Sequence, residues 1–303
     1  MDLRDTPKIL FLTAAASMAL LVILIFGFIA WTAAPVLVKT GPGFITGTVW
    51  DYDTSTYGIL VFIAGTLVLT AVTMAIVIPI GILTAIYLAE WAPAPVERIL
   101  RPSIELLIGI PSVVFGIFGF FVLRGYFAHT INPAIGAVLG WIPFLRDTTP
   151  GSGTGILLAA TVLSVMTLPT IVALSQEAMR SVPKEFREAS LALGATRWET
   201  VRHVVLPSAF PGILTSVILA MMRAAGETMA VVMLLGNLAE LPGSVLGGGY
   251  AMTSKILNDI GFYMGEAEPR SALFAIALVL FIIEIGMVAI VRAASARIRG
   301  ACP

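Results

Sequence analysis

The sequence predicts an all-α integral membrane protein with six transmembrane helices. Of its 303 residues, 58% are hydrophobic and only 12% are charged, whereas a soluble domain carries about 25% charged residues. The mean hydropathy is +0.98, and long uncharged stretches recur along the chain. Basic and acidic side chains balance to a net charge of zero. The chain therefore lacks the excess of positive charge that is typical of nucleic-acid-binding proteins. These observations together place the chain in a bilayer.

The first predicted span is the uncharged stretch 9–38, which lies between Lys8 and Lys39. About 20 apolar residues suffice to cross a bilayer, so this stretch is long enough. Arg4 and Lys8 ahead of an apolar run also resemble the start of a signal peptide. The run is too long for the hydrophobic region of such a signal, so we expect a retained helix.

Five further spans follow from the same pattern of apolar stretches and polar interruptions. Pro79 and Gly81 are expected to bend the second span, and Pro169 the fourth. Three segments are expected as loops on one side of the membrane: 41–57, 124–152 and 237–270. Residues 90–101 are expected as a turn on the other side of the membrane. The predicted spans are 58–89, 102–123, 153–176, 208–235 and 271–291.

The distribution of lysine and arginine predicts the orientation. Twelve of the eighteen basic residues lie in the N-terminus, the 90–101 turn, the segment between the fourth and fifth spans, and the C-terminus. Cytoplasmic loops carry the excess of basic residues in membrane proteins. Both termini are therefore expected in the cytoplasm. The only cysteine, Cys302, excludes an internal disulfide and a cysteine metal cluster.

The third predicted span contains GIPSVVFGIFG, residues 109–119. Its glycines and Ser112 allow a neighbouring backbone to approach closely, and Pro111 leaves a backbone carbonyl without its helical partner. Two interpretations stay open. The small residues can form a stripe for helix packing, or the interrupted helix can line a pathway for an anion.

The fifth predicted span carries Arg223 and Glu227, where a charge costs on the order of 2.5–3.5 kcal/mol. At positions i and i+4 they would share a helix face and could form an ion pair. That pair could only fix helix packing. Alternatively, Arg223 could offer its bidentate donor fork to a passing oxyanion, with Glu227 keeping binding weak enough for release. Glu284 in the sixth span is expected to form an interhelical hydrogen bond, with a proton relay as the alternative, and Glu105 is expected to lie near the cytoplasmic edge.

The charged segment between the fourth and fifth spans predicts an elbow of two short helices. Phe186, Ala189, Ser190 and Leu193 recur at helical spacing on one face. Gly194 follows at the position of a left-handed C-terminal cap. Thr196 and Glu199 form the pattern of a capping box that starts a second helix, which Pro207 is expected to end.

This elbow resembles the EAA loop of ABC importer permeases. The family pattern is E-A-A, three residues, G, nine residues, I-x-L-P; here Glu188-Ala189-Ser190 precedes Gly194 and then Val204-Val205-Leu206-Pro207. Ser190 and Val204 are mild departures that keep the spacing. The resemblance implies a type I importer architecture, in which residues 178–207 dock on an ATPase subunit. It assigns this coupling contact to Phe186, Glu188, Ala189, Ser190, Leu193 and Gly194.

The segment Arg223-Ala-Ala-Gly-Glu227-Thr-Met-Ala-Val-Val, together with GIPSVVFGIFG, resembles the PstC type of phosphate permease. Residues 1–303 would then form one transmembrane domain with a five-span core at 58–292. The resemblance implies a PstA-like permease partner, two ATPase subunits, an external phosphate-binding protein and a location in the inner membrane. Arg223, Glu227 and Ser112 are the candidate substrate-pathway residues.

No lysine follows a glycine, so a phosphate-binding loop of the G-x-x-x-x-G-K-[ST] type cannot occur in this chain. ATP and magnesium would be used by the partner ATPase, with no cofactor or metal on this chain, which is therefore not expected to be an enzyme. The open alternatives are an importer of another oxyanion such as sulfate or molybdate, a stand-alone secondary transporter or channel, and a membrane scaffold or sensor.

Overall fold

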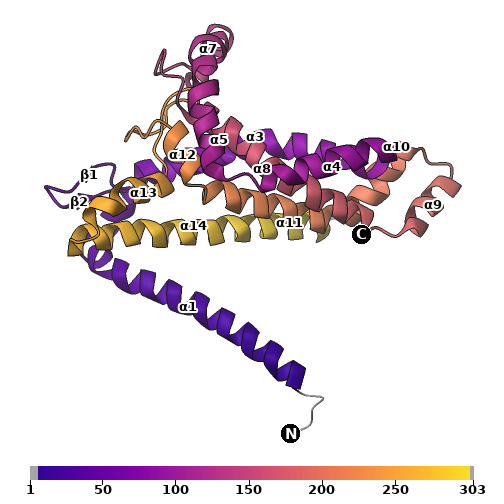
Figure 1. Ribbon diagram of the computed structural model, residues 1–303, viewed down its shortest axis with the longest axis horizontal. Helices are drawn as coiled ribbons and strands as arrows, with labels where there is room; N and C mark the ends of the chain where they lie inside the picture. Colours follow the sequence, from indigo (N-terminus) through magenta and orange to yellow (C-terminus); the bar gives the residue numbers. More distant parts are fainter. Residues whose placement is uncertain (1–5, 301–303) are drawn as a thin grey trace. The chain divides into compact units, whose positions relative to one another are not determined.

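The computed structural model describes residues 6–300, which form two compact units (Figure 1). The first unit combines Met1–Leu60 with Ile256–Ile283, and the second combines Val61–Lys255 with Glu284–Pro303. Arg4 and Cys302, on which two of the sequence arguments rest, lie outside the described residues. Six helices among the described residues are long and apolar enough to cross a membrane, in agreement with the predicted number.

The first unit contains α1 (Thr6–Thr40), α2 (Gly43–Thr46) and a small hairpin, together with parts of α13 (Met252–Tyr263) and α14 (Ala267–Gly300). The hairpin pairs β1 (Trp50–Asp51) with β2 (Thr56–Tyr57) in antiparallel register, Trp50 opposite Tyr57. Ser271 joins α14 to α1, because its hydroxyl accepts from Val36 N at 3.2 Å and donates to Ala33 O at 3.4 Å. Buried hydroxyls are a common means of holding membrane helices together.

The second unit holds most of the helices. A π-helical turn at Tyr87–Trp91 extends its first helix, and two more, at Gly119–Leu123 and Phe127–Ile131, make one long helical segment out of α5 to α7. A fourth, at Val201–Val205, joins α10 to α11. The helices are α3 (Leu60–Ile86), α4 (Ala94–Ile108), α5 (Ser112–Phe118), α6 (Arg124–Tyr126), α7 (Asn132–Leu139), α8 (Ile156–Arg180), α9 (Lys184–Ala192), α10 (Arg197–Thr200), α11 (Leu206–Ala225) and α12 (Met229–Leu234).

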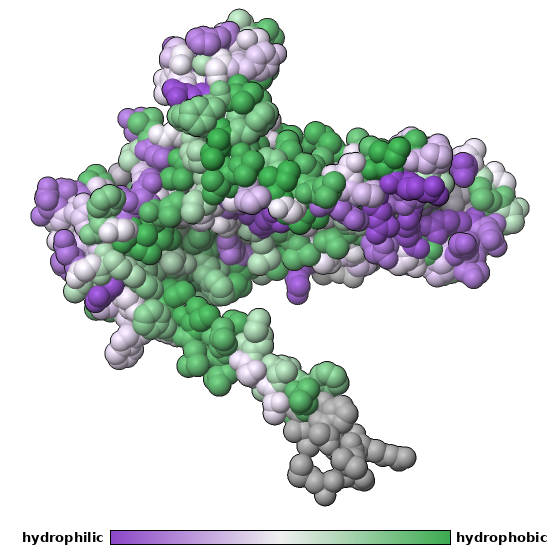
Figure 2. Space-filling view, in the orientation of Figure 1, coloured by the Kyte–Doolittle hydropathy of each residue, from purple (hydrophilic) through white to green (hydrophobic). Residues whose placement is uncertain are grey.

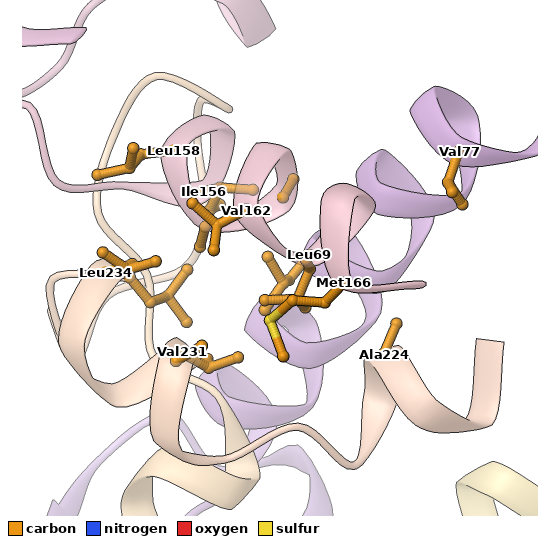
Figure 3. Close-up of a cluster of buried hydrophobic side chains, with 14 of the residues drawn as sticks. Leu69, Val77, Ile156, Leu158, Val162, Met166, Ala224, Val231 and Leu234 are labelled. Atoms are coloured by element: carbon orange, nitrogen blue, oxygen red, sulfur yellow. The ribbon is translucent and has the colours of Figure 1, made fainter. Parts of the chain in front are cut away.

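The core of the second unit is centred on α8. Leu69 from α3, Val162 and Met166 from α8, and Val231 and Leu234 from α12 meet in one buried cluster (Figure 3). Hydrogen bonds between buried side chains also link its helices; for example, the hydroxyls of Ser175 and Ser216 lie 2.8 Å apart between α8 and α11. Since lipid is as apolar as these side chains, close packing and such hydrogen bonds hold the helices together.

Two of the six predicted spans have the wrong bounds. The third candidate span is 112–139, and residues 124–139 are helical rather than part of an outside loop. Pro133 follows directly after the π-helical turn Phe127–Ile131, where the regular α-helical hydrogen-bond pattern is already interrupted. Similarly, Pro207 does not end the elbow's second helix, because it lies in the first turn of α11 and the chain stays helical over 197–225.

Candidate functional site

The fifth span is broken between Arg223 and Glu227. Helix α11 ends at Ala225, Gly226 is its C-cap, and α12 begins only at Met229. The predicted single helix over 208–235 is therefore wrong, and the two side chains do not share a helix face. Among the described residues, no ion pair joins Arg223 to Glu227. Glycine has low helix propensity, which makes Gly226 a suitable place for the helix to stop.

Polar groups fill this break. Glu227 is half-buried, its backbone carbonyl accepts from the Thr253 hydroxyl at 2.9 Å, and its carboxylate accepts from the Thr228 N–H at 3.2 Å. Glu284 of α14 also reaches the break, since a Cβ added at Gly226 would lie 3.4 Å from its Oε1. Arg223 is exposed. The break thus combines two carboxylates with backbone groups released from helical pairing, and Arg223 precedes it in the last turn of α11.

Ser112 lies at a second break, between α4 and α5, at the start of the third span. The chain leaves α4 at Gly109 and resumes a helix at Ser112, after Pro111. Helix α5 then runs beside α12 in the same direction: a Cβ on Gly116 would lie 3.2 Å from Ala230 Cα, and one on Gly119 would lie 2.9 Å from the Leu234 side chain.

The packing interpretation of the small-residue stripe is confirmed at Gly116 and Gly119, but not at Gly109, which meets only its own helix. The pathway interpretation stays open. Ser112 precedes Gly116 by about one helical turn, and Glu227 precedes Ala230 by a similar distance. Ser112 and Glu227 thus each lie shortly before the stretch over which α5 packs on α12.

The elbow has the predicted local structure. Helix α9 starts after Pro183, which is its N-cap rather than part of its first turn, and Gly194 follows with φ of +87°. Thr196 and Glu199 form both hydrogen bonds of a capping box. Because a left-handed φ strains any residue with a Cβ, glycine suits position 194. The left-handed Gly194 and the capping box both depend only on residues that are close in the sequence.

The residues predicted to contact the ATPase are mostly on the surface of the elbow. Glu188 and Ala189 are exposed, Phe186 is 53% exposed and Leu193 is 90% exposed. Ser190 instead lies inside the elbow, where its hydroxyl is 2.9 Å from that of Thr200. Figure 2 shows hydrophilic residues gathered over the end of the second unit that carries α9 and α10. Exposed apolar residues within such a polar surface are typical of a contact for another protein.

Arg187 anchors the elbow to two spans. Its Nη2 donates to Glu90 at 3.0 Å, at the end of the second span, and to Met179 O at 2.7 Å. Its Nη1 donates to Val182 O at 2.5 Å, just beyond the fourth span. The Arg187 and Glu90 side chains are only 20% and 14% exposed, so this ion pair is largely shielded from water. Sequence reasoning did not single out either residue.

A second ion pair holds α4 to the same end of α8. Arg180 Nη2 lies 2.6 Å from Glu97 Oε1. The hydrogen bond from Arg180 holds the pKa of the Glu97 carboxyl below its ordinary value. The end of the second span, helix α4 and the end of the fourth span are therefore held to one another or to the elbow by arginine contacts.

Comparison with known proteins agrees with this architecture. Residues 77–300 match the model of the family described as the binding-protein-dependent transport system inner membrane component. The chain belongs to that family. It is 38% identical over 257 residues to the probable ABC transporter permease protein YqgH of Bacillus subtilis, covering 84% of this chain and 77% of that protein.

Relatives with a named cargo support the resemblance to the PstC type. The permease is 35% identical to the phosphate transport system permease protein PstC of Mesorhizobium japonicum, over 90% of this chain and 85% of that one. It is 34% identical to PstC of Haemophilus influenzae, over 88% and 82%. A solved bacterial ABC transporter for alginate import shares the fold with a TM-score of 0.61 at 16% identity, over 97% and 96%. The chain is thus a multi-pass membrane permease.

Three charged residues near these features were placed wrongly or given another role by sequence reasoning. Lys255, expected in an outer loop, is buried, with Nζ 5.6 Å and 5.8 Å from the ring centres of Phe62 and Tyr250. Arg124, expected in an outside loop, belongs to the helical third span. Glu284 was expected to form an interhelical hydrogen bond or a proton relay, and its carboxylate reaches the break at Gly226. Charge within a candidate membrane span is the signal that marks Arg124 and Glu284.

Proposed function

We propose that this permease forms one half of the translocation pathway of an ATP-driven phosphate importer. The observation that carries the proposal is the exposed Arg223 guanidinium at a break in the fifth span, with no ion-pair partner among the described residues. A charge at such a position requires a cavity, a partner or a ligand. The relatives named as phosphate permeases supply the identity of the anion.

In this proposal, Arg223 binds the oxyanion and Glu227 limits how tightly it is held. A planar guanidinium matches two oxygens of a tetrahedral anion. The carboxylates of Glu227 and Glu284 repel the same anion, so its stay at the site is short. Ser112, at the break of the neighbouring span, would add a hydroxyl to the pathway.

The elbow provides the coupling to ATP hydrolysis. Phe186, Glu188, Ala189, Leu193 and Gly194 would contact an ATPase subunit, and Ser190 would support them from inside the elbow. The full assembly would contain a PstA-like permease, two ATPase subunits that use ATP and magnesium, and an external phosphate-binding protein. Both termini would lie in the cytoplasm, as the distribution of basic residues indicates.

Uptake of labelled phosphate into vesicles that contain the assembled complex tests the proposal. We expect ATP-dependent uptake that an excess of sulfate does not reduce. Arg223→Gln should lower the uptake rate at least about tenfold, because the loss of one charge-assisted hydrogen bond alone has that effect. Arg98→Gln, at an exposed arginine of α4 that lies outside the elbow and both breaks, is the matched control and should transport normally.

Each outcome bears on a different part of the proposal. Normal uptake by Arg223→Gln would remove this residue from the mechanism. Uptake of sulfate in place of phosphate would keep the architecture and change the substrate. Flux without ATP would contradict the coupling and favour a channel or a secondary transporter.

A further inference from the structure

A second cationic pocket lies on the third span, away from Arg223. It is an open cavity of about 470 Å³ within the second unit. Its walls come from the π-helical turn and α6 of the third span, from the loop before α8, and from the end of α12. The residues that matter for its chemistry are Phe120, Arg124, Thr154, Val232 and Asn237.

Arg124 is held in a fixed orientation at this pocket. Its Nε donates to Ser152 O at 2.8 Å, and its Cζ lies 4.9 Å from the centre of the Phe120 ring. No ion pair of Arg124 with a carboxylate occurs among the residues that the structure describes. An arginine within a candidate membrane span that lacks a countercharge is expected to face a ligand or a partner. The two Nη nitrogens of the guanidinium are separate from the Nε that donates to Ser152.

The opposite wall of the pocket is polar and rigid. Thr154 contributes a hydroxyl that lies 2.7 Å from the Ser152 hydroxyl. Asn237 adopts a left-handed φ of +51°, which costs a non-glycine residue energy, and its Nδ2 donates to Val232 O at 2.8 Å. Gly153 packs so closely on Arg124 O that a Cβ there would collide with it. The loop and the end of α12 therefore hold a preformed site.

The pocket and the break at Arg223 lie at opposite ends of α12. Arg124 follows Ser112 by twelve residues, or roughly 18 Å along a helix. Asn237 follows Glu227 by ten residues, and α5 and α12 run side by side in the same direction. An ion that moves along these helices would meet the two arginines in series. Several weak sites in series allow an ion to enter and still leave.

We infer that this pocket is an entry site for oxyanions, at which Arg124 and the Thr154 hydroxyl bind phosphate before it reaches Arg223. The inference rests on the proposed function for the direction of travel and for the identity of the anion. The ligand class follows from the pocket itself, since a guanidinium and a hydroxyl both donate to anionic oxygens. A carboxylate of a partner protein is the competing occupant, and the experiment separates it from phosphate.

The test measures binding at the pocket without relying on transport. Val232→Cys, in a Cys302→Ser background, places a nearly isosteric thiol in the pocket wall of the assembled complex. We expect inorganic phosphate to slow its modification by a water-soluble thiol reagent. Arg124→Gln should raise the phosphate concentration needed for half-protection by about tenfold or more, because a charge-assisted hydrogen bond is lost. Arg124→Lys should restore protection only partly, because lysine keeps the charge but not the fork.

Three further variants make the result specific. Arg146→Gln removes an exposed arginine of the preceding loop and should leave protection unchanged. Asn237→Asp adds a negative charge to the pocket at constant size and should weaken protection. Arg223→Gln should keep protection while it loses uptake.

The inference is overturned if phosphate gives no protection, or if Arg124→Gln is protected as well as the parent protein. Loss of a partner subunit from the purified Arg124→Gln complex, with no effect of phosphate on labelling, would identify Arg124 as an interface residue instead. If phosphate protects but is not transported by the unaltered complex, the pocket stands and the proposed function fails. If the unaltered complex transports phosphate but protection does not depend on Arg124, the proposed function stands and the entry site is rejected.

Discussion

A single glycine sets how closely α3 approaches the chain at Tyr250. A Cβ on Gly65 would collide with the Tyr250 carbonyl oxygen and would lie 2.9 Å from its carbon. Both are backbone atoms, which cannot turn away as a flexible side chain can. Tyr250 in turn lies beside the buried Lys255, so this contact positions a charge as well as a helix.

Gly65→Ala should therefore destabilise the permease by about 1–3 kcal/mol, as other overpacked cores are destabilised. The matched control is Gly286→Ala in α14, where no heavy atom lies within 4 Å of the added Cβ. Alanine favours a helix over glycine, so the control should be neutral or stabilising. Thermal unfolding of the purified complex measures both, and equal transition temperatures would show that the chain at Tyr250 shifts freely.

At the scale of elements, Arg187 holds the elbow against the ends of the second and fourth spans through Glu90 and the Met179 carbonyl. We expect Arg187→Ala to uncouple the complex: ATP hydrolysis continues while phosphate uptake falls by about tenfold or more, because the hydrogen bonds of a buried charged group are lost. The hydrolysis and uptake rates of one preparation give the coupling ratio. Arg98→Ala, at an exposed arginine of α4 outside the elbow, should keep the normal ratio. An unchanged ratio in Arg187→Ala would show that the elbow transmits force through other contacts.

The ion pair between Glu97 and Arg180 gives a pH prediction. Because the pKa of Glu97 is lowered in the folded protein, the contact is complete above the ordinary glutamate pKa of about 4.3. It is lost only as the pH falls through the lower folded value. Spin labels on Ile99 of α4 and Leu174 of α8, both exposed, should keep a narrow distance distribution from pH 8 to 5. Glu97→Gln should broaden it throughout, and broadening of the parent protein near pH 6 would contradict the assignment.

Local signals in the sequence were sufficient for the elements they control. The capping box at Thr196 and the left-handed turn at Gly194 depend on neighbours only, and both were predicted. The break at Gly226 was missed because an apolar stretch with one glycine has the same pattern whether the helix continues or stops. Glu284, Arg124 and Lys255 owe their surroundings to residues far away in the sequence, which hydrophobic patterns do not reveal.

At the scale of the whole molecule, the exposed face of the elbow predicts how the permease assembles. Leu193 is 90% exposed next to charged residues, and burial of a leucine side chain contributes about 1.5–3 kcal/mol. Leu193→Asp should therefore weaken the association with the ATPase by about tenfold or more. Copurification of the ATPase at several concentrations measures the effect. Leu241→Asp, at a leucine 53% exposed in the loop after α12, is the control, and equal losses would point to general misfolding.

The attachment of Arg187 to both Glu90 and the carbonyl of Met179 has a consequence for equilibrium as well as for force. If docking of the ATPase on the elbow changes how strongly the spans hold phosphate, phosphate must change the affinity of the ATPase by the same factor. Phosphate held by the spans would then change the affinity for the ATPase on the cytoplasmic side before any ATP is hydrolysed. A titration of the ATPase against the permease, with and without phosphate, would measure this change in affinity directly. Arg187→Ala should abolish both the effect of phosphate on ATPase binding and the effect of the ATPase on phosphate binding.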